Sequence, residues 1–195
     1  MANQAKTFNI SGIENLIREN GGGWAFAHIQ RLLKLIEQIG SDLEYDTQTM
    51  LWAVYLHDWG AFSKYSQPGG EHALISRQIA ETEILPNVDL PDSMKTVILE
   101  AIELHDYRDK RPVSTNEALL LREADFLDFL GVIGISREFA RGPKDLQKSY
   151  QQILSRRKQI QDRFTIPQAK LIAAERLARM DEFFKALLDE SFGYL

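Results

Sequence analysis

Apolar residues recur every three to four positions along most of this chain, and no stretch alternates in the manner of a half-buried strand. The clearest case runs from about Trp24 to Ile39, where a buried stripe ends at Gly40. A second apolar segment runs from about Thr47 to His57. This periodicity predicts an all-α fold.

Turn and capping residues divide the pattern into further helices. Ser11 and Ser114 are each followed three residues later by a glutamate, the spacing of a capping box, and predict the starts of a first and a sixth helix. Pro91 predicts the start of a fifth helix that carries His105. Pro167 should separate two C-terminal helices, while the loop around Pro68 should precede a fourth helix.

The length of 195 residues is enough for one domain with a real core. No repeat, low-complexity tract or linker interrupts it. We therefore expect a single domain over residues 1–195, with a helical bundle over about 24–142 and a C-terminal helical extension over about 144–192. Gly131 and Gly134 lie in a small-residue stretch expected to let helices approach closely.

Composition narrows the chemistry. The chain has no cysteine, which excludes a disulfide framework, a thiolate zinc site and a catalytic thiol, so a metal would need histidines and carboxylates. The missing thiols, and the absence of a signal-like or membrane-spanning apolar run, lead us to expect a cytoplasmic protein without membrane association. A net charge of −5 with both signs interspersed argues against duplex nucleic acid as a partner.

All four histidines fall between residues 28 and 105, on or beside apolar helical segments. His28 lies on one predicted helix, the pair His57-Asp58 ends the next, and Asp125 is embedded in the segment ALLLREADFLDFLG. An acidic residue on an apolar stripe must be paired or bound to a metal, and each histidine alone is also compatible with a structural role. Together, two imidazoles and two carboxylates suit a divalent transition metal such as Mn, Fe, Ni or Co. Asp128 shares the face of Asp125 and is expected to cap a neighbouring helix or to support a ligand.

These residues resemble the HD-domain metal-dependent phosphohydrolase superfamily, whose pattern is a His, an adjacent His-Asp and a later Asp, all on helices. The resemblance covers about residues 24–142. The segments WAFAHIQRLLKL and ADFLDFLGVIGISREFARG are similar to the first-ligand helix and the last-ligand segment of small bacterial HD hydrolases. It implies a single-domain HD-type helical bundle with metal ligands at His28, His57, Asp58 and Asp125.

The resemblance also implies roles for the other two histidines. In two-metal members of the superfamily, histidines at places comparable to His72 and His105 bind a second ion, so one ion or two are expected. With one ion, these histidines would contact substrate phosphates or donate a proton to the leaving group. Glu71, beside His72, is a further acid/base candidate, with a helix N-terminal charge as its alternative.

The activity implied is that of a phosphoric ester or anhydride hydrolase, in which metal-activated water attacks the phosphorus of a nucleotide or another small phosphorylated metabolite. Asp58 would ligate with one oxygen and orient water with the other. Lys64 and Arg122, together with Arg31 or Arg108, are candidates to offset phosphoryl charge, with a solvent-facing position as the alternative for each.

Two departures bear on the substrate. The segment YSQPGGEH lacks the Gly-Tyr-Pro signature of the cyclic-dinucleotide phosphodiesterase branch, and WAFAH differs from the Ser-His-Asp-Trp lead-in of triphosphate-cleaving members. Two other classes stay open: a di-iron oxygenase of the same superfamily, and a sensor that binds a nucleotide or metal without turnover. Trp59 and Tyr65 are expected to line a pocket. The phenylalanines at 183, 184 and 192 predict either a packed helix or a homodimer contact.

Overall fold

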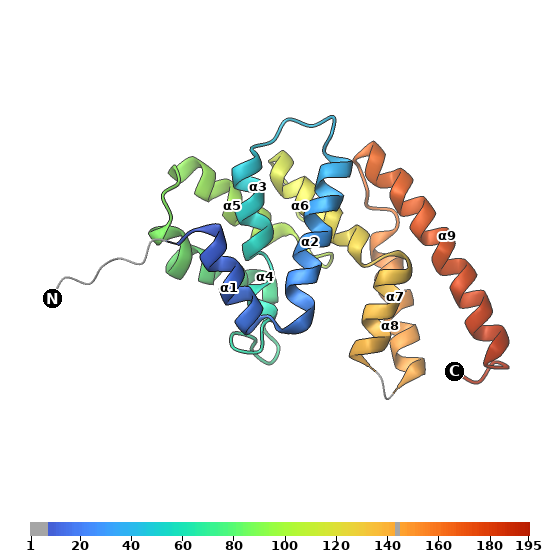
Figure 1. Cartoon of the computed structure of the whole chain (residues 1–195). Helices are drawn as coiled ribbons and strands as arrows, with labels where there is room; N and C mark the ends of the chain where they lie inside the picture. Colours follow the sequence, from blue (N-terminus) through green and yellow to red (C-terminus); the bar gives the residue numbers. More distant parts are fainter. Residues whose placement is uncertain (1–7, 143–144) are drawn as a thin grey trace. The chain divides into compact units, whose positions relative to one another are not determined.

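A computed structural model describes residues 8–142 and 145–195 of the chain (Figure 1). Within these ranges the regular structure is helical and no strand occurs, which confirms the all-α prediction. None of the described helices is long and apolar enough to cross a bilayer. Lys144, the expected start of the C-terminal helices, lies outside the described residues. The α-helices are α1 (Ile10–Asn20), α2 (Gly22–Ile39), α3 (Thr47–Leu56), α4 (His72–Ile79), α5 (Asp92–Leu104), α6 (Asn116–Asp128), α7 (Gly131–Arg141), α8 (Leu146–Ile160) and α9 (Pro167–Glu190).

The chain divides into two compact units, Met1–Arg122 and Glu123–Leu195, and the boundary falls inside α6. The first unit holds α1 to α5, three short elements and the first part of α6. The short elements are the 3-10 turn η1 (Trp59–Ala61), the π-helical segment η2 (Ala80–Ile84) and the 3-10 turn η3 (Leu85–Asn87). Our expectation of one domain stays a prediction.

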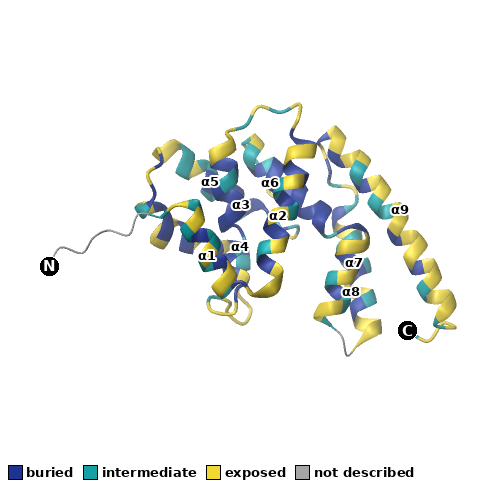
Figure 2. Ribbon diagram, viewed as in Figure 1, coloured by how far each residue is buried: buried dark blue, intermediate teal, exposed yellow. Residues whose placement is uncertain are grey.

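Helix α3 is the centre of the first unit, where it packs against α1, α2 and α5. Its residues are buried nearly all the way round, as its dark blue ribbon in Figure 2 shows. The helix begins where the Asp46 side chain accepts a hydrogen bond of 2.6 Å from the Thr49 N–H. Because α3 runs through the core, the residues at its C-terminal end are delivered into the interior of the unit.

Both capping-box predictions were wrong in their cap residue. The N-cap of α1 is Asn9, whose side chain accepts from the Gly12 N–H at 2.8 Å, so Ser11 lies inside the helix. Asparagine caps a helix as well as serine does, and it comes first along the chain.

The sixth helix begins one residue later than predicted, for a different reason. The hydroxyl of Thr115 accepts from the Ala118 N–H at 3.2 Å, while the Ser114 hydroxyl donates to Glu100 of α5 at 2.7 Å. Glu117 accepts from the Asp46 N–H at 2.7 Å and so helps to fix the start of α3. The partners of these side chains are distant in sequence, which the local spacing does not reveal.

In the second unit, α7 packs against α8 and α9. Pro167 is the first residue of α9, as predicted. Helix α7 begins at Gly131 with φ +72°, and a Cβ there would lie 3.1 Å from the Arg176 side chain of α9, so the small residue does permit close packing. Gly134, in contrast, packs on the backbone of Phe129, because a Cβ there would lie 2.0 Å from its carbonyl oxygen.

Candidate metal centre

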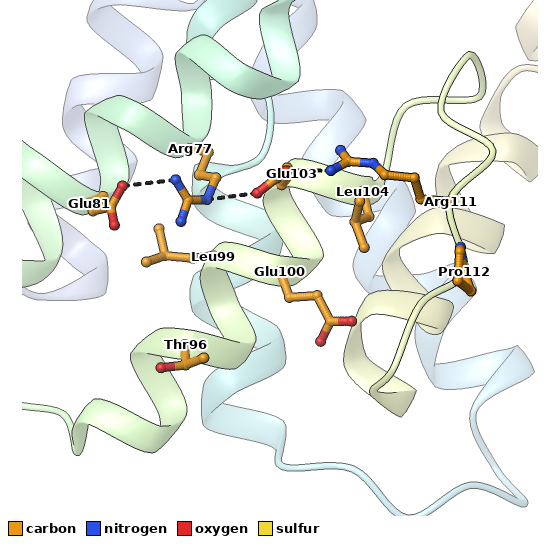
Figure 3. A pocket seen from close by; sticks show the side chains of 9 residues that line it. All are labelled: Arg77, Glu81, Thr96, Leu99, Glu100, Glu103, Leu104, Arg111 and Pro112. Carbon is orange, nitrogen blue, oxygen red and sulfur yellow. Dashed lines mark hydrogen bonds and ion pairs between the residues drawn. The ribbon is translucent and has the colours of Figure 1, made fainter.

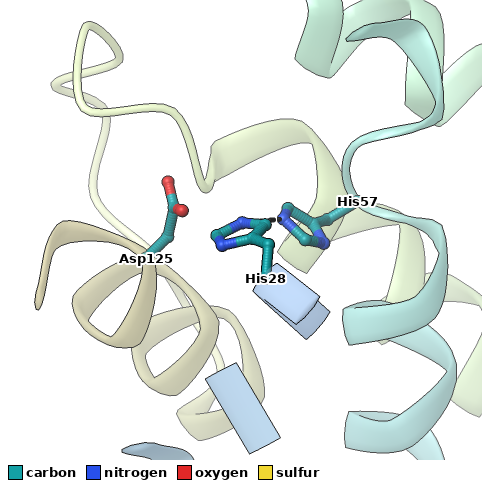
Figure 4. Close-up of side chains that lie close together, drawn as sticks. All are labelled: His28, His57 and Asp125. Carbon is teal, nitrogen blue, oxygen red and sulfur yellow. Dashed lines mark hydrogen bonds between the residues drawn. The ribbon is translucent and has the colours of Figure 1, made fainter. Parts of the chain in front are cut away.

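Four histidines of the first unit converge on one carboxylate, that of Asp58. The Oδ2 atom of Asp58 lies 3.5 Å from His28 Nε2 and 3.4 Å from His57 Nε2, and these two nitrogens are 3.2 Å apart. Figure 4 shows the His28 and His57 rings turned toward each other, one from α2 and one from the end of α3.

The other Asp58 oxygen faces the second pair of histidines. Oδ1 lies 3.4 Å from His72 Nε2 and 3.7 Å from His105 Nε2, and these nitrogens are 3.1 Å apart. Asp58 therefore stands between two imidazole pairs, with one oxygen toward each. His28, His57 and His105 are almost completely buried, whereas the His72 side chain is 27% exposed.

Two of the imidazoles have a fixed tautomer. The Nδ1 atom of His57 is 2.7 Å from the Val54 carbonyl oxygen, and that of His105 is 2.6 Å from the Ile102 carbonyl oxygen. A carbonyl oxygen only accepts, so each Nδ1 carries a hydrogen, and Nε2 is the ring nitrogen turned toward Asp58. Both histidines are C-cap residues, of α3 and α5, and their rings bond carbonyls that the helix ends leave free.

The Asp58 carboxyl is held as an anion. Burial by itself would raise its pKa, but the imidazoles of His57, His105 and His72 lower the pKa well below its usual value near 3.8. At neutral pH the centre therefore holds a carboxylate among four imidazoles.

The turn that carries Asp58 is fastened to the helix that carries His72. Gly60 of η1 donates its N–H to the Ser76 hydroxyl at 2.8 Å, and that hydroxyl donates to the His72 carbonyl at 2.8 Å. A Cβ on Gly60 would lie 2.2 Å from the same carbonyl oxygen. Only glycine fits at this crossing, so local packing sets the distance between Asp58 and His72.

His72 has its own support on the outer side. Its Nδ1 atom lies 3.3 Å from Asp106 Oδ2 and 3.2 Å from Arg108 Nη2. The Arg108 guanidinium also bonds both oxygens of Asp106. Burial would raise the pKa of the Asp106 carboxyl, but these hydrogen bonds from Arg108 outweigh burial and lower it below 3.8.

The donor set fits a divalent transition metal. Imidazole nitrogens and carboxylate oxygens are the ligands that such ions share, and His57, Asp58 and His105 each offer a ligand atom within 4.8 Å of the others. Three of the histidines also have the acceptor near Nδ1 that metal-binding histidines need. His57 and His105 have the backbone carbonyls of Val54 and Ile102, and His72 has the Asp106 carboxylate.

The sequence-predicted ligands divide between the two units. The structure brings His28, His57 and Asp58 together, with His72 and His105 beside them, all in the first unit. Asp125, also labelled in Figure 4, lies on α6 in the second unit and is 4% exposed. Its role as a ligand stays a prediction.

Arg122 is buried, so the solvent-facing alternative is wrong for this residue. Its guanidinium donates to the carbonyl oxygens of Leu104 at 2.6 Å and Arg111 at 2.9 Å. It thus holds the segment that follows α5 and contains His105. Lys64 is exposed near the Tyr65 ring, and a phosphate-binding role for either cation stays a prediction.

The other candidates take varied positions. Trp59 is buried and donates its indole N–H to the Tyr55 carbonyl at 2.9 Å, with Tyr65 stacked on it, which makes Trp59 a core residue. Glu71 is exposed at the N-cap of α4, and Arg31 is half-buried on α2. Asp128 pairs with Arg137 of α7 within the second unit.

Sequence reasoning missed Asp106 and Ser76. Asp106 follows His105 directly, and a carboxylate next to a candidate ligand is a signal that would have identified it. Ser76 lies four residues after His72 on the same helix, and this spacing carries no signal specific to its bond with Gly60.

A separate cavity of about 590 Å³ lies between α4, α5 and the segment after α5 (Figure 3). None of the four histidines lines it. Arg77 pairs with Glu81 and Glu103, both at 2.9 Å, and Arg111 pairs with Glu103 at 2.7 Å, so both arginines of this cavity are already paired with carboxylates. The lining residues are Arg77, Glu81, Thr96, Leu99, Glu100, Glu103, Leu104, Arg111 and Pro112.

Solved structures similar to this chain carry the same fold. A predicted HD superfamily hydrolase from an uncultured Thermotogales bacterium is 22% identical, with a TM-score of 0.67 over 93% of this chain and 92% of that one. An HD-superfamily hydrolase from Bacillus thuringiensis is 20% identical, with a TM-score of 0.66 over 93% of each chain. Bacillus subtilis YpgQ in complex with ADP is 18% identical, with a TM-score of 0.70 over 92% of this chain and 93% of that one.

Sequence comparisons give the family directly. None of the curated proteins matches the chain in sequence. The HD domain matches residues 25–130, which is more than half of the chain and includes all four histidines, Asp58 and Asp125. With the His57-Asp58 pair at the centre of the observed site, this chain belongs to the HD domain family.

Proposed function

We propose that this protein is a metal-dependent phosphohydrolase that acts on a nucleotide or another small phosphorylated metabolite. The observation that carries the proposal is the position of Asp58, with one carboxylate oxygen facing His28 and His57 and the other facing His72 and His105. A carboxylate enclosed by imidazole nitrogens is the donor set of a cation site. The same cluster would not stabilise an apolar core, because burying polar groups costs free energy.

In this proposal, His28, His57, Asp58 and Asp125 would hold one ion, and His72 and His105 would hold the second where two ions bind. Asp125 follows Arg122 by three residues on α6, and residues three apart share a helix face. Arg122 bonds the carbonyls on either side of the His105 segment. The HD domain match also includes Asp125, which supports its assignment as the last ligand.

When bound, such an ion polarises a phosphoryl oxygen and supplies a hydroxide-like nucleophile near neutral pH. The residues of the chain orient the water and attract the substrate. Asp58, 16% exposed, is the anion that orients the attacking water, and His72 is the most exposed imidazole of the centre. Arg108, whose side chain is 56% exposed beside His72, places a positive charge where a substrate phosphate would enter.

The nucleotide as substrate class has independent support. YpgQ, whose fold this chain shares, has been crystallised with ADP. The cations Arg108 and Lys64 and the open side of His72 are compatible with an anionic ligand of this kind.

A di-iron oxygenase is the second candidate, because two imidazole pairs on one bridging carboxylate also suit two irons. The two functions differ in their co-substrate. A phosphohydrolase releases phosphate or pyrophosphate under anaerobic conditions, whereas an oxygenase consumes dioxygen and requires two irons.

The test begins with anaerobic purification, metal analysis and a panel of nucleotides and phosphate esters, with dioxygen uptake followed in parallel. Asp58→Asn should lose bound metal and turnover together. Asp92→Asn makes the same chemical change at an exposed position on α5 and should keep both. Stoichiometric metal in Asp58→Asn, or a metal-loaded wild type that cleaves nothing on the panel, would overturn the proposal.

A further inference from the structure

The outer nitrogen of His72 faces two groups that demand opposite hydrogen positions. Asp106 Oδ2, at 3.3 Å from Nδ1, only accepts a hydrogen bond, and Arg108 Nη2, at 3.2 Å from Nδ1, only donates one. A neutral imidazole satisfies one of the two at a time. His57 and His105 have no such choice, because their Nδ1 atoms face backbone carbonyls.

Each choice has a consequence at the inner nitrogen. If Nδ1 carries the hydrogen and donates to Asp106, the Nε2 lone pair of His72 faces Asp58 and His105, as a metal ligand must. If Arg108 donates to Nδ1, the hydrogen moves to Nε2, where Asp58 Oδ1 at 3.4 Å and the lone pair of His105 Nε2 at 3.1 Å accept it. The second form needs no cation, because His72 itself bridges the two acceptors.

We infer that Asp106 and Arg108 are positioning residues that set the tautomer of His72, and through it the occupancy of the second ion site. Asp106 favours the form that accepts an ion, and Arg108 favours the form that closes the site without one. The inference rests on the proposed two-ion centre. It assigns these two residues opposite effects on the same binding event.

The local structure supports this assignment. Asp106 is buried while the Arg108 side chain is more than half exposed, so the arginine is the member that solvent or a ligand reaches. The backbone N–H of Arg108 also donates to Asp106 Oδ1 at 2.8 Å, which keeps the carboxylate in place independently of the guanidinium. Removing the Arg108 side chain therefore leaves Asp106 free to accept from His72.

The sequence offers a matched control three residues further on. Asp109 and Arg111 repeat the same arrangement, with an Arg111 backbone N–H to Asp109 Oδ1 at 2.8 Å and guanidinium bonds to both carboxylate oxygens. The Arg111 guanidinium also donates to Glu103 at 2.7 Å, whereas the Arg108 guanidinium lies against His72. Asp109→Asn and Arg111→Gln thus repeat the chemical changes away from the centre.

The experiment uses the full chain and the variants Asp106→Asn and Arg108→Gln, titrated with Mn²⁺ by calorimetry. Asp106→Asn should weaken the second ion by about tenfold or more, as loss of a carboxylate behind a ligating histidine does. Arg108→Gln should tighten it by about fivefold, the equivalent of one competing hydrogen bond. Both control variants should bind as the wild type does.

A second readout uses the metal-free protein. Long-range ¹H–¹⁵N spectra report which ring nitrogen of His72 carries the hydrogen. Asp106→Asn should shift His72 toward the Nε2–H form and Arg108→Gln toward the Nδ1–H form. This readout tests the tautomer even if only one ion binds, in which case the two-ion proposal fails by itself. Because Arg108→Gln alters an exposed side chain, it carries the test if Asp106→Asn does not fold.

A change of second-ion affinity in the same direction in both variants would indicate mere loosening of the structure and overturn the inference. An unchanged His72 tautomer in both would also overturn it. Opposite shifts, absent from the Asp109 and Arg111 controls, would support it.

Discussion

Replacing Gly60 by alanine tests how the centre is assembled. A Cβ at this position would lie 2.2 Å from the His72 carbonyl oxygen and 2.8 Å from the Ile75 Cβ, where ordinary contact begins at 3.4 Å. The backbone of α4 has to move away from η1 by about 1 Å. Overpacking of this kind costs about 1–3 kcal/mol in the free energy of unfolding. The same shift separates Asp58 from His72, and displaced ligands lose about 10–100-fold in metal affinity.

Urea unfolding of the chelator-treated protein measures the first effect, and Mn²⁺ titration measures the second. Gly23→Ala is the matched control, because nothing lies within 4 Å of a Cβ there and alanine is the better helix former. It should leave metal binding unchanged and raise stability by about 0.5–1 kcal/mol. A Gly60→Ala protein with wild-type stability and metal affinity would refute the argument that this crossing sets the Asp58–His72 distance.

Two further predictions concern residues outside the ligand set. Arg122→Met keeps an unbranched apolar side chain but removes the guanidinium that donates to the Leu104 and Arg111 carbonyls, and should cost about 1.5–3 kcal/mol in urea unfolding. Unchanged stability with slower turnover would instead identify Arg122 as a substrate contact. Burial raises the pKa of Glu123 above 4.5, so its contribution to stability is full at pH below 4.5 and is lost as pH rises through the raised pKa. The free energy of unfolding of Glu123→Gln, relative to that of the wild type, should therefore be higher at pH 7 than at pH 4. An equal difference at the two pH values would contradict this.

Local sequence predicted the helices well where one residue decides the boundary. Gly40 ends α2, Pro167 begins α9 and His57 ends α3, in agreement with the residues expected from their backbone properties. The caps at Asn9 and Thr115 were missed because a serine nearby offered the same chemistry. For Ser114, a contact with a distant segment excludes it as the cap, because its hydroxyl donates to Glu100.

The sequence predicted which residues form the site better than it predicted how they are arranged. Residue types and apolar surroundings pointed to His28, His57 and Asp58, and the resemblance to HD hydrolases pointed to His72 and His105. Neither predicted that Asp58 stands between two pairs. That arrangement depends on the Gly60–Ser76 crossing, a contact between η1 and α4. Trp59 was expected to line a pocket, but it is buried in the core, where its indole N–H donates to the Tyr55 carbonyl.

The two histidines at helix ends explain why this position suits a cation. His57 and His105 are C-cap residues, so α3 and α5 both end at the centre, and a helix C-terminus carries partial negative charge from its free carbonyls. Each ring takes one of those carbonyls as the acceptor for Nδ1 and thereby aims Nε2 at Asp58. The same feature thus orients the ligand and favours positive charge beside it. Helix α4 differs, because its first residue, His72, places an N-terminal end at the centre. The directions of α3 and α5 therefore favour a cation beside His57 and His105, whereas the start of α4 favours negative charge beside His72.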